Sequence, residues 1–153
     1  MLVVGLMTIG HGAWAFSCSD VTEIPNTECE ALVALYDSTD GDNWIVNTDW
    51  NVTNTPCSWY GIACSGKHVV TVSLRANKLT GTVPAEIGNL TNLHTLYIDR
   101  NQLTSLPPEI GNLANLSTFY VYNNQLSSLP TEIGNLAKLH TFYVYSKNSI
   151  NRI

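Results

Sequence analysis

The chain of 153 residues is long enough for one domain with its own hydrophobic core. Its 12 acidic and 7 basic residues give a formal net charge of −5 and an isoelectric point of about 5.1. Because the basic residues are scattered rather than grouped in a stripe, the composition argues against a nucleic-acid partner.

The first residues have the pattern of a secretory signal peptide. The apolar run Leu2–Ile9 is too short to span a bilayer, and Ala13–Ala15 follows it as a small-x-small cleavage site. No Lys or Arg precedes the run, and the alternative is a buried N-terminal strand. We predict a signal peptide over residues 1–15, no membrane span, and a mature chain near Phe16 that is secreted or held at the cell surface.

Four cysteines precede the repeats described below, and they fit an oxidising compartment. They are Cys18, Cys29, Cys57 and Cys64. Of the three pairings that four cysteines allow, we favour Cys18–Cys29 and Cys57–Cys64, because each pair is close in sequence and brackets one small unit. The alternative is a zinc site, but no CxxC spacing exists and the histidines lie elsewhere, so we expect no metal.

Residues 16–68 do not repeat, and we assign them to an N-terminal cap. Thr27 and Glu30 have the spacing of a capping box, and apolar residues follow at helical spacing, which predicts a helix over about 28–37. The turn Asp40–Asn43 should end it. A solenoid needs a covered terminus to stay soluble, so we expect nearby rings to pack over the first repeat. These rings are Trp44, Trp50, Trp59 and Tyr60.

A block of about 23 residues recurs from Val69 onward. The copies occupy 69–92, 93–115, 116–138 and, in part, 139–153. Self-similarity at this period indicates a solenoid, in which each unit buries its apolar face against its neighbours. Solenoids mostly bind other molecules, which makes an enzyme the least expected class.

The cap carries a family resemblance. The segment Glu30–Tyr36, Trp44, Trp50 and the segment Pro56–Cys64 resemble the N-terminal cap of extracellular leucine-rich repeat proteins. Such caps precede the repeats of plant receptor-like kinases, polygalacturonase-inhibiting proteins and many bacterial surface proteins. The resemblance covers roughly residues 18–150 and implies a Cys57–Cys64 disulfide. The first repeat resembles the plant type and the later ones a bacterial style, which favours a bacterial surface protein.

The resemblance implies an α/β fold, a leucine-rich repeat solenoid shaped as a horseshoe with a helical, disulfide-bonded cap. A parallel sheet lines the concave face, short helical turns form the convex face, and the leucine positions point inward. One asparagine per repeat should satisfy backbone groups where the chain leaves the strand. This ladder consists of Asn77, Asn101, Asn124 and Asn148.

The last copy matches the others with one inserted residue, and no C-terminal cap pattern follows it. We therefore expect a bare apolar edge there. Either the chain is a fragment, as of a receptor or adhesin ectodomain, or this edge is covered by a partner or by self-association.

Between the inward columns, alternate strand residues should project from the concave face. Successive repeats place tyrosines at equivalent positions there, with charged residues at one end. The candidate ligand-binding residues are Tyr97, Tyr120, Tyr143, Tyr122, Tyr145, Asp99, Arg75 and Arg100. Tyrosine offers a large contact area at low entropy cost, which favours a binding surface. The alternatives are cross-strand stacking without a ligand, or tyrosines copied by recent duplication.

No catalytic, metal or cofactor set can be argued from the sequence. His94 and His140 share one repeat position but should lie roughly 10 Å apart, too far for one metal ion. We predict a non-catalytic recognition module without a cofactor that binds a protein or peptide on its concave face. The alternatives are a truncated ectodomain, carbohydrate binding by the tyrosine face, or pairing of that face with a second copy.

Overall fold

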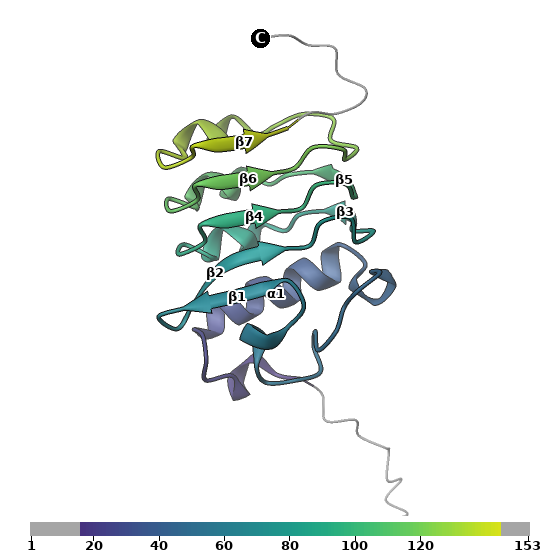
Figure 1. The fold of residues 1–153 in the computed structure, drawn as a ribbon, viewed down its shortest axis with the longest axis vertical. Coiled ribbons are helices and arrows are strands. Elements are labelled where there is room, and N and C mark those ends of the chain that lie inside the picture. The colour runs from purple at the N-terminus through teal and green to yellow at the C-terminus, as the bar shows by residue number, and fades with distance from the viewer. Residues whose placement is uncertain (1–15, 145–153) are drawn as a thin grey trace, which may run out of the picture.

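A computed structural model describes residues 16–144. The predicted signal peptide, Tyr145 and Asn148 lie outside the described residues. Within them, one sheet runs along the length of the molecule with the strand order β1-β2-β4-β6-β7 (Figure 1). Its strands are β1 (Ile62–Ser65), β2 (His68–Ser73), β4 (Thr95–Tyr97), β6 (Thr118–Tyr120) and β7 (Thr141–Tyr143).

The repeat period determines the register of this sheet. The strands β2, β4, β6 and β7 are parallel, and Thr71 pairs with Thr95, which pairs in turn with Thr118. Equivalent residues of successive repeats therefore lie side by side. The chain is a leucine-rich repeat solenoid, as predicted. Two features were not foreseen: β1 pairs antiparallel with β2, and a second small sheet joins β3 (Thr80–Thr82) to β5 (Gln102–Ser105).

Short 3-10 turns form the convex side, at Ala85–Asn89, Pro108–Asn112 and Thr131–Asn135. Their isoleucines and the strand leucines enclose one continuous core. All but one of the inward apolar positions of the first three repeats are at most 1% exposed: Val69, Val72, Leu74, Leu79, Leu93, Leu96, Ile98, Leu103, Leu116, Phe119 and Val121. The exception is Leu126, in the third repeat, which is partly buried. Burial of these apolar side chains is the main force that joins each repeat to the next.

Buried asparagines hold the turn that follows each strand. The Oδ1 atom of Asn101 accepts from the amides of Asn77 and Leu79, at 2.9 and 3.0 Å. Its Nδ2 atom donates to the carbonyls of Leu74 and Ile98, both at 2.9 Å. Asn101 thus ties its own turn to the preceding repeat, because one amide group has both donors and an acceptor.

The two neighbouring asparagines extend this pattern in both directions. Asn124 accepts from the Leu103 amide at 2.9 Å and donates to the Ile98 carbonyl at 2.9 Å. Asn77 instead reaches into the cap, where it accepts from the Val46 amide at 2.7 Å and donates to the Val46 carbonyl at 2.8 Å. The cap is therefore joined to the repeats by the same side chain that joins the repeats to one another.

Helix α1 of the cap spans Asn26–Ser38, longer at both ends than predicted. The capping-box prediction is wrong, because Pro25 occupies the N-cap position and no side chain caps the helix. Glu30 bonds instead to the side chain of Asn26, at 2.6 Å. Pro25 lies at φ −58° and ψ 147°, an extended conformation directly before the helix, which begins two residues earlier than predicted.

A buried carboxylate docks α1 onto the first repeat. Glu28 is 3% exposed, and its Oε2 atom accepts from the Val69 amide at 2.8 Å. Its Oε1 atom lies 2.6 Å from Nδ1 of His68. The helix packs beside the first convex turn, so α1 and β1 together cover the end of the solenoid in place of a further repeat.

Three tryptophans fill the space between α1 and β1. Trp50 lies at the centre, with its ring centroid 5.0 Å from that of Trp44 and 5.1 Å from that of Trp59. Each indole N–H donates to a backbone carbonyl, so no buried donor is lost. Tyr60 does not join them: its ring is 39% exposed, and only its carbonyl takes part, as the acceptor for Trp50.

Disulfides join Cys18 to Cys29 and Cys57 to Cys64 in the cap. The first ties the start of the described chain to α1, and the second ties the loop before β1 to β1 itself. No helix within residues 16–144 is long and apolar enough to cross a membrane.

Gly111→Ala is expected to lower the free energy of unfolding by about 1–3 kcal/mol, because overpacking a tight contact costs this much. The added Cβ would lie 2.6 Å from the Glu132 carbonyl oxygen. Gly134→Ala is the matched control, since it sits at the same place in the next turn and no described atom lies within 4 Å of its added Cβ. Urea unfolding followed by circular dichroism measures both. Equal losses would show that repeat stacking does not require this glycine.

Glu28→Ala should also destabilise the protein, by about 1–3 kcal/mol, because it leaves the buried Val69 amide without an acceptor. Glu30→Ala, on the exposed side of the same helix, should change the free energy of unfolding by less than about 0.5 kcal/mol. The same urea titration compares the two variants. A loss for Glu30→Ala as large as for Glu28→Ala would assign the effect to helix propensity instead of cap docking.

Candidate functional site

Tyrosines form a ladder on the concave face of the sheet. Tyr97, Tyr120 and Tyr143 occupy equivalent positions in β4, β6 and β7 and pair in register. The ring centroids of neighbouring members are 4.7 Å apart in both steps, close to the spacing of the strands that carry them. Tyr122 extends the group sideways, 6.2 Å from Tyr120 and 6.5 Å from Tyr143. We call these four residues the tyrosine cluster.

The rings of the tyrosine cluster shield one another from solvent. Tyr143 is 55% exposed, whereas the other three are only partly exposed. The pKa of the Tyr120 phenol is raised above its usual value, first by desolvation and then by the neighbouring phenols of Tyr143 and Tyr97. The Tyr120 phenol is therefore neutral at physiological pH and presents an uncharged polar group among aromatic surface.

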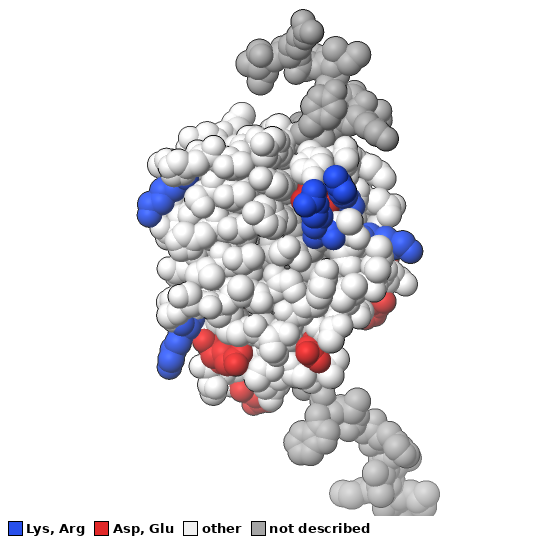
Figure 2. All heavy atoms as spheres, in the orientation of Figure 1, with Lys and Arg blue, Asp and Glu red and all other residues white. Residues whose placement is uncertain are grey.

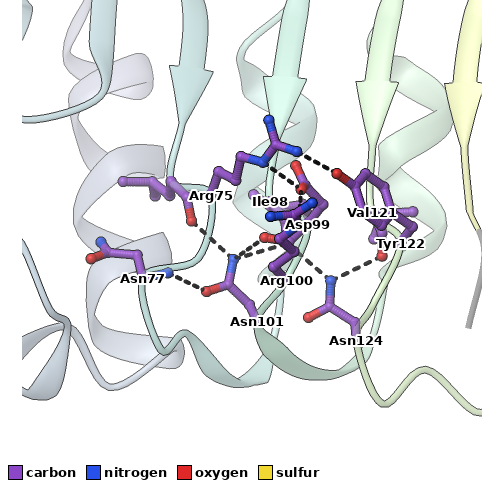
Figure 3. A network of polar contacts seen from close by, with 10 residues as sticks. Arg75, Asn77, Ile98, Asp99, Arg100, Asn101, Val121, Tyr122 and Asn124 are labelled. Carbon is purple, nitrogen blue, oxygen red and sulfur yellow. Dashed lines mark hydrogen bonds and ion pairs between the residues drawn. The ribbon is translucent and has the colours of Figure 1, made fainter. Parts of the chain in front are cut away.

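Charged residues meet at one end of the tyrosine cluster (Figure 3). The Nε atom of Arg75 lies 2.9 Å from Oδ2 of Asp99, and the Nε atom of Arg100 lies 3.9 Å from the same oxygen. A terminal nitrogen of Arg75 also donates to the Tyr122 hydroxyl. Both guanidinium carbons lie within 6 Å of the Tyr122 ring centroid, at 5.9 and 5.8 Å, in the range of cation–π contacts.

The prediction that the Asp99 side chain is exposed on the concave face to contact a ligand is wrong, because this side chain is completely buried. Two long arginines and the Tyr122 ring cover it. Although Arg75 lies at ion-pair distance, no described group donates a well-oriented hydrogen bond to either carboxylate oxygen. Asp99 therefore acts on the surface only through the two arginines above it.

The rest of the concave face is largely uncharged. A threonine column flanks the tyrosine ladder in register, formed by Thr71, Thr95, Thr118 and Thr141. Figure 2 shows the same view as Figure 1 as mainly white, with one group of basic side chains on the right and other basic side chains at the left edge. A ligand on this sheet would thus contact mainly hydroxyl groups and aromatic rings. It would contact charge only at the end of the tyrosine cluster where Arg75 and Arg100 lie, which we call the arginine end.

Other places in the described chain offer less. His94 and His140 are exposed, and residues 16–144 contain no group of three or more His, Cys, Asp or Glu that could hold a metal ion. A hollow of about 560 Å³ lies beside α1 and the first convex turn, with Glu30, Asp37 and Glu86 in its wall. It lies apart from the tyrosine cluster, so we place the candidate site on the concave sheet.

Sequence reasoning found the columns but missed one contact within a column. Arg75 belongs to the first repeat and Tyr122 to the third, yet their side chains touch. The available signal was that both occupy the same repeat position, with Asp99 between them. An arginine is long enough to cross one intervening repeat when the residue there is short.

Comparison with known proteins agrees with this geometry. The parallel sheet, the asparagine ladder and the covered end define a capped solenoid. A family model described as a leucine-rich repeat region matches residues 68–153, and one described as a leucine-rich repeat N-terminal domain matches residues 25–65. The chain belongs to the leucine-rich repeat family.

Curated relatives include plant receptor kinases. Receptor-like kinase TMK4 of Arabidopsis thaliana is 40% identical over 57 residues, which are 37% of this chain and 6% of that protein. A probable LRR receptor-like serine/threonine-protein kinase of the same plant is 36% identical over 105 residues, 67% of this chain and 14% of that protein. The matches thus cover a small part of each relative. The preference for a bacterial surface protein stays a prediction.

Among solved structures, that of PEPR1 with AtPEP1 is similar to this chain. The identity is 27%, the TM-score is 0.67, and the match covers 79% of this chain and 18% of that one. The cap match and the two disulfides are consistent with an extracellular protein.

Arg75→Gln is expected to lower the free energy of unfolding by about 1–3 kcal/mol, because it leaves the buried Asp99 carboxylate without its nearest cation. The loss should stay below that of a fully buried pair, since Arg75 is 46% exposed. Arg100→Asn should cost less than about 0.5 kcal/mol, because its Nε is more distant and asparagine tolerates a positive φ. Urea unfolding measures the free energy of unfolding of both variants. Equal losses would contradict the assignment of Arg75 as the main partner of Asp99.

Proposed function

We propose that this chain is an exported, non-catalytic recognition module that binds a protein or peptide on its concave face. The observation that carries the proposal is the tyrosine cluster, a group of touching aromatic rings on an open sheet face where the exposed charges, Arg75 and Arg100, lie at one end of the cluster. Tyrosine dominates the binding energy of many interfaces because it buries a large area with few rotatable bonds.

The rigidity of the cluster supports the same proposal. Each ring rests on a neighbour and on a strand whose register is held by the asparagine ladder. A surface ordered before binding loses little further entropy when a ligand arrives, which favours affinity. An extended segment lying across the strands could contact Tyr97, Tyr120 and Tyr143 in sequence.

The comparisons support a recognition role at the level of the fold. The solved structure of PEPR1 with AtPEP1 resembles this chain over 79% of its length. The kinase activity named for the curated relatives is not transferred here, because the matches cover at most 14% of the two relatives described above.

A peptide selection tests the proposal. Random 12-residue peptides are displayed and selected on the wild-type protein, and their dissociation constants are measured for two triple variants. The first variant, called the ladder variant, combines Tyr97→Ser, Tyr120→Ser and Tyr143→Ser and so removes the tyrosine ladder. The control carries Asn89→Ser, Asn112→Ser and Asn135→Ser, one exposed convex column of the same three repeats. We expect the ladder variant to bind about tenfold more weakly or worse, and the convex variant to bind like the wild type.

Peptides that bind the ladder variant as well as the wild type would contradict the proposal. Should the triple variant lose its fold, Tyr143→Ser carries the test alone, since that ring is the most exposed. Size-exclusion chromatography with light scattering runs alongside: a dimer that the ladder variant abolishes would mean that the face pairs with a second copy. Glycan-array binding that is lost with the ladder would instead support a carbohydrate ligand.

A further inference from the structure

The arginine end of the tyrosine cluster has an excess of positive charge. Arg75 and Arg100 share a single carboxylate, that of Asp99, so the group carries a formal charge of +1. Asp99 is completely buried, whereas the two arginines are 46% and 55% exposed. The negative charge is thus beneath the surface, and the positive charge faces outward next to aromatic rings.

From this arrangement we infer that Arg75, Asp99, Arg100 and Tyr122 form a subsite for a carboxylate of the peptide bound on the tyrosine cluster. The inference rests on the proposed function and adds the chemistry of the ligand. The peptide would carry an apolar or aromatic residue over the ladder and, beside it, an acidic side chain or a free chain terminus.

The orientation of the two guanidinium groups is the first step of the argument. Both turn their Nε edge toward Oδ2 of Asp99. The terminal nitrogens make no hydrogen bond to Asp99, whose carboxylate oxygens have no hydrogen-bond partner within residues 16–144. One of Arg75 donates to the Tyr122 hydroxyl, and those of Arg100 make no hydrogen bond to any residue within 16–144. These terminal N–H groups form the fork that matches a carboxylate.

Tyr122 restricts the arginines further. Its ring lies 5.9 Å from the guanidinium carbon of Arg75 and 5.8 Å from that of Arg100. A guanidinium held on an aromatic ring keeps less freedom than one in open solvent, and it is less strongly hydrated than an ammonium. Both effects lower the cost of binding an anion at this place.

The charge balance selects the class of anion. A single excess positive charge matches a carboxylate, whereas a phosphate group brings close to two negative charges at neutral pH. The described concave columns hold one acidic residue, the buried Asp99, so nothing exposed beside it repels an incoming carboxylate.

The backbone at Arg100 has a conformation that its equivalents in the neighbouring repeats share, which guides the choice of a test variant. Arg100 has φ 57°, in the left-handed region, and the equivalent residue of the next repeat is Asn123, at φ 54°. Asparagine adopts this conformation more readily than arginine does. Ala76, at the same position of the preceding repeat, lies at φ 51°, so the left-handed backbone belongs to the repeat whatever residue stands there. Asn123 therefore supplies a substitution for Arg100 that should preserve the turn.

Three peptides test the inference by NMR titration of the Arg75 and Arg100 Nε–H signals. The probes are acetyl-Ser-Phe-Ser-Glu-Ser-amide, the same peptide with Gln for Glu, and the Gln peptide with a free C-terminal carboxylate. We expect the Glu peptide, the free-terminus peptide or both to bind about fivefold more tightly than the neutral peptide. Which of the two carboxylate peptides gains identifies the source of the carboxylate.

Variants separate a built subsite from simple attraction. Arg100→Asn should abolish the preference for carboxylate peptides, measured as the ratio of the dissociation constants of the neutral and the carboxylate peptides for this variant. Arg100→Lys keeps the charge but lacks the fork, so about half of the preference, on a logarithmic scale, should be lost. Asp99 is a positioning residue. Asp99→Asn should weaken carboxylate binding, although removal of the carboxylate makes the net charge of the site more positive by one. Tighter binding by Asp99→Asn would overturn the inference in favour of long-range attraction.

The remaining outcomes distinguish the two proposals. If Glu, Gln and free-terminus peptides bind equally and Tyr143→Ser weakens all three, the carboxylate subsite is refuted and the concave recognition surface stands. If millimolar concentrations of all three peptides leave the arginine signals unchanged, the subsite is also refuted. If the carboxylate preference persists in Tyr143→Ser at undiminished affinity, the subsite acts alone and the ladder-based function fails.

Discussion

The asparagine ladder is the constraint on which the rest of this structure depends. Every strand must give way to a turn that leads to the convex side, and the turn leaves backbone groups that the core cannot satisfy. Asn101 meets this need by bonding to the backbone of its own repeat and of the preceding one. Because of these bonds, neighbouring repeats cannot shift by one residue relative to each other. They also cannot lie farther apart than neighbouring strands of one sheet.

The surface inherits its regularity from that constraint. Because equivalent residues of successive repeats lie side by side, a residue type that recurs in the sequence becomes a column on the sheet. Tyr97, Tyr120 and Tyr143 touch for this reason. Positions whose residue type changes from repeat to repeat are equally informative. At one such position the first three repeats carry Arg75, Asp99 and Tyr122, and the charged end of the tyrosine cluster lies there.

The cap solves a different problem with similar chemistry. It has no repeat of its own, so it must supply acceptors and donors for the first strand from unrelated residues. Glu28 accepts from the Val69 amide, and Asn77 bonds to Val46. The tryptophans then cover the apolar end of the core, with each indole N–H bonded to a carbonyl. The concave sheet is left free because the cap covers only the end and the convex side.

The sequence by itself determined the period, the inward columns and the alignment of the tyrosines, because these follow from residue spacing along one strand and its repeats. Only the tertiary structure decided how deep each side chain lies. Asp99 is buried because longer neighbours from other repeats cover it, and Tyr60 is exposed although three tryptophans beside it are not. The burial of a side chain depends on the size of neighbours that are far away in sequence. The repeat spacing alone does not show which of these neighbours cover it.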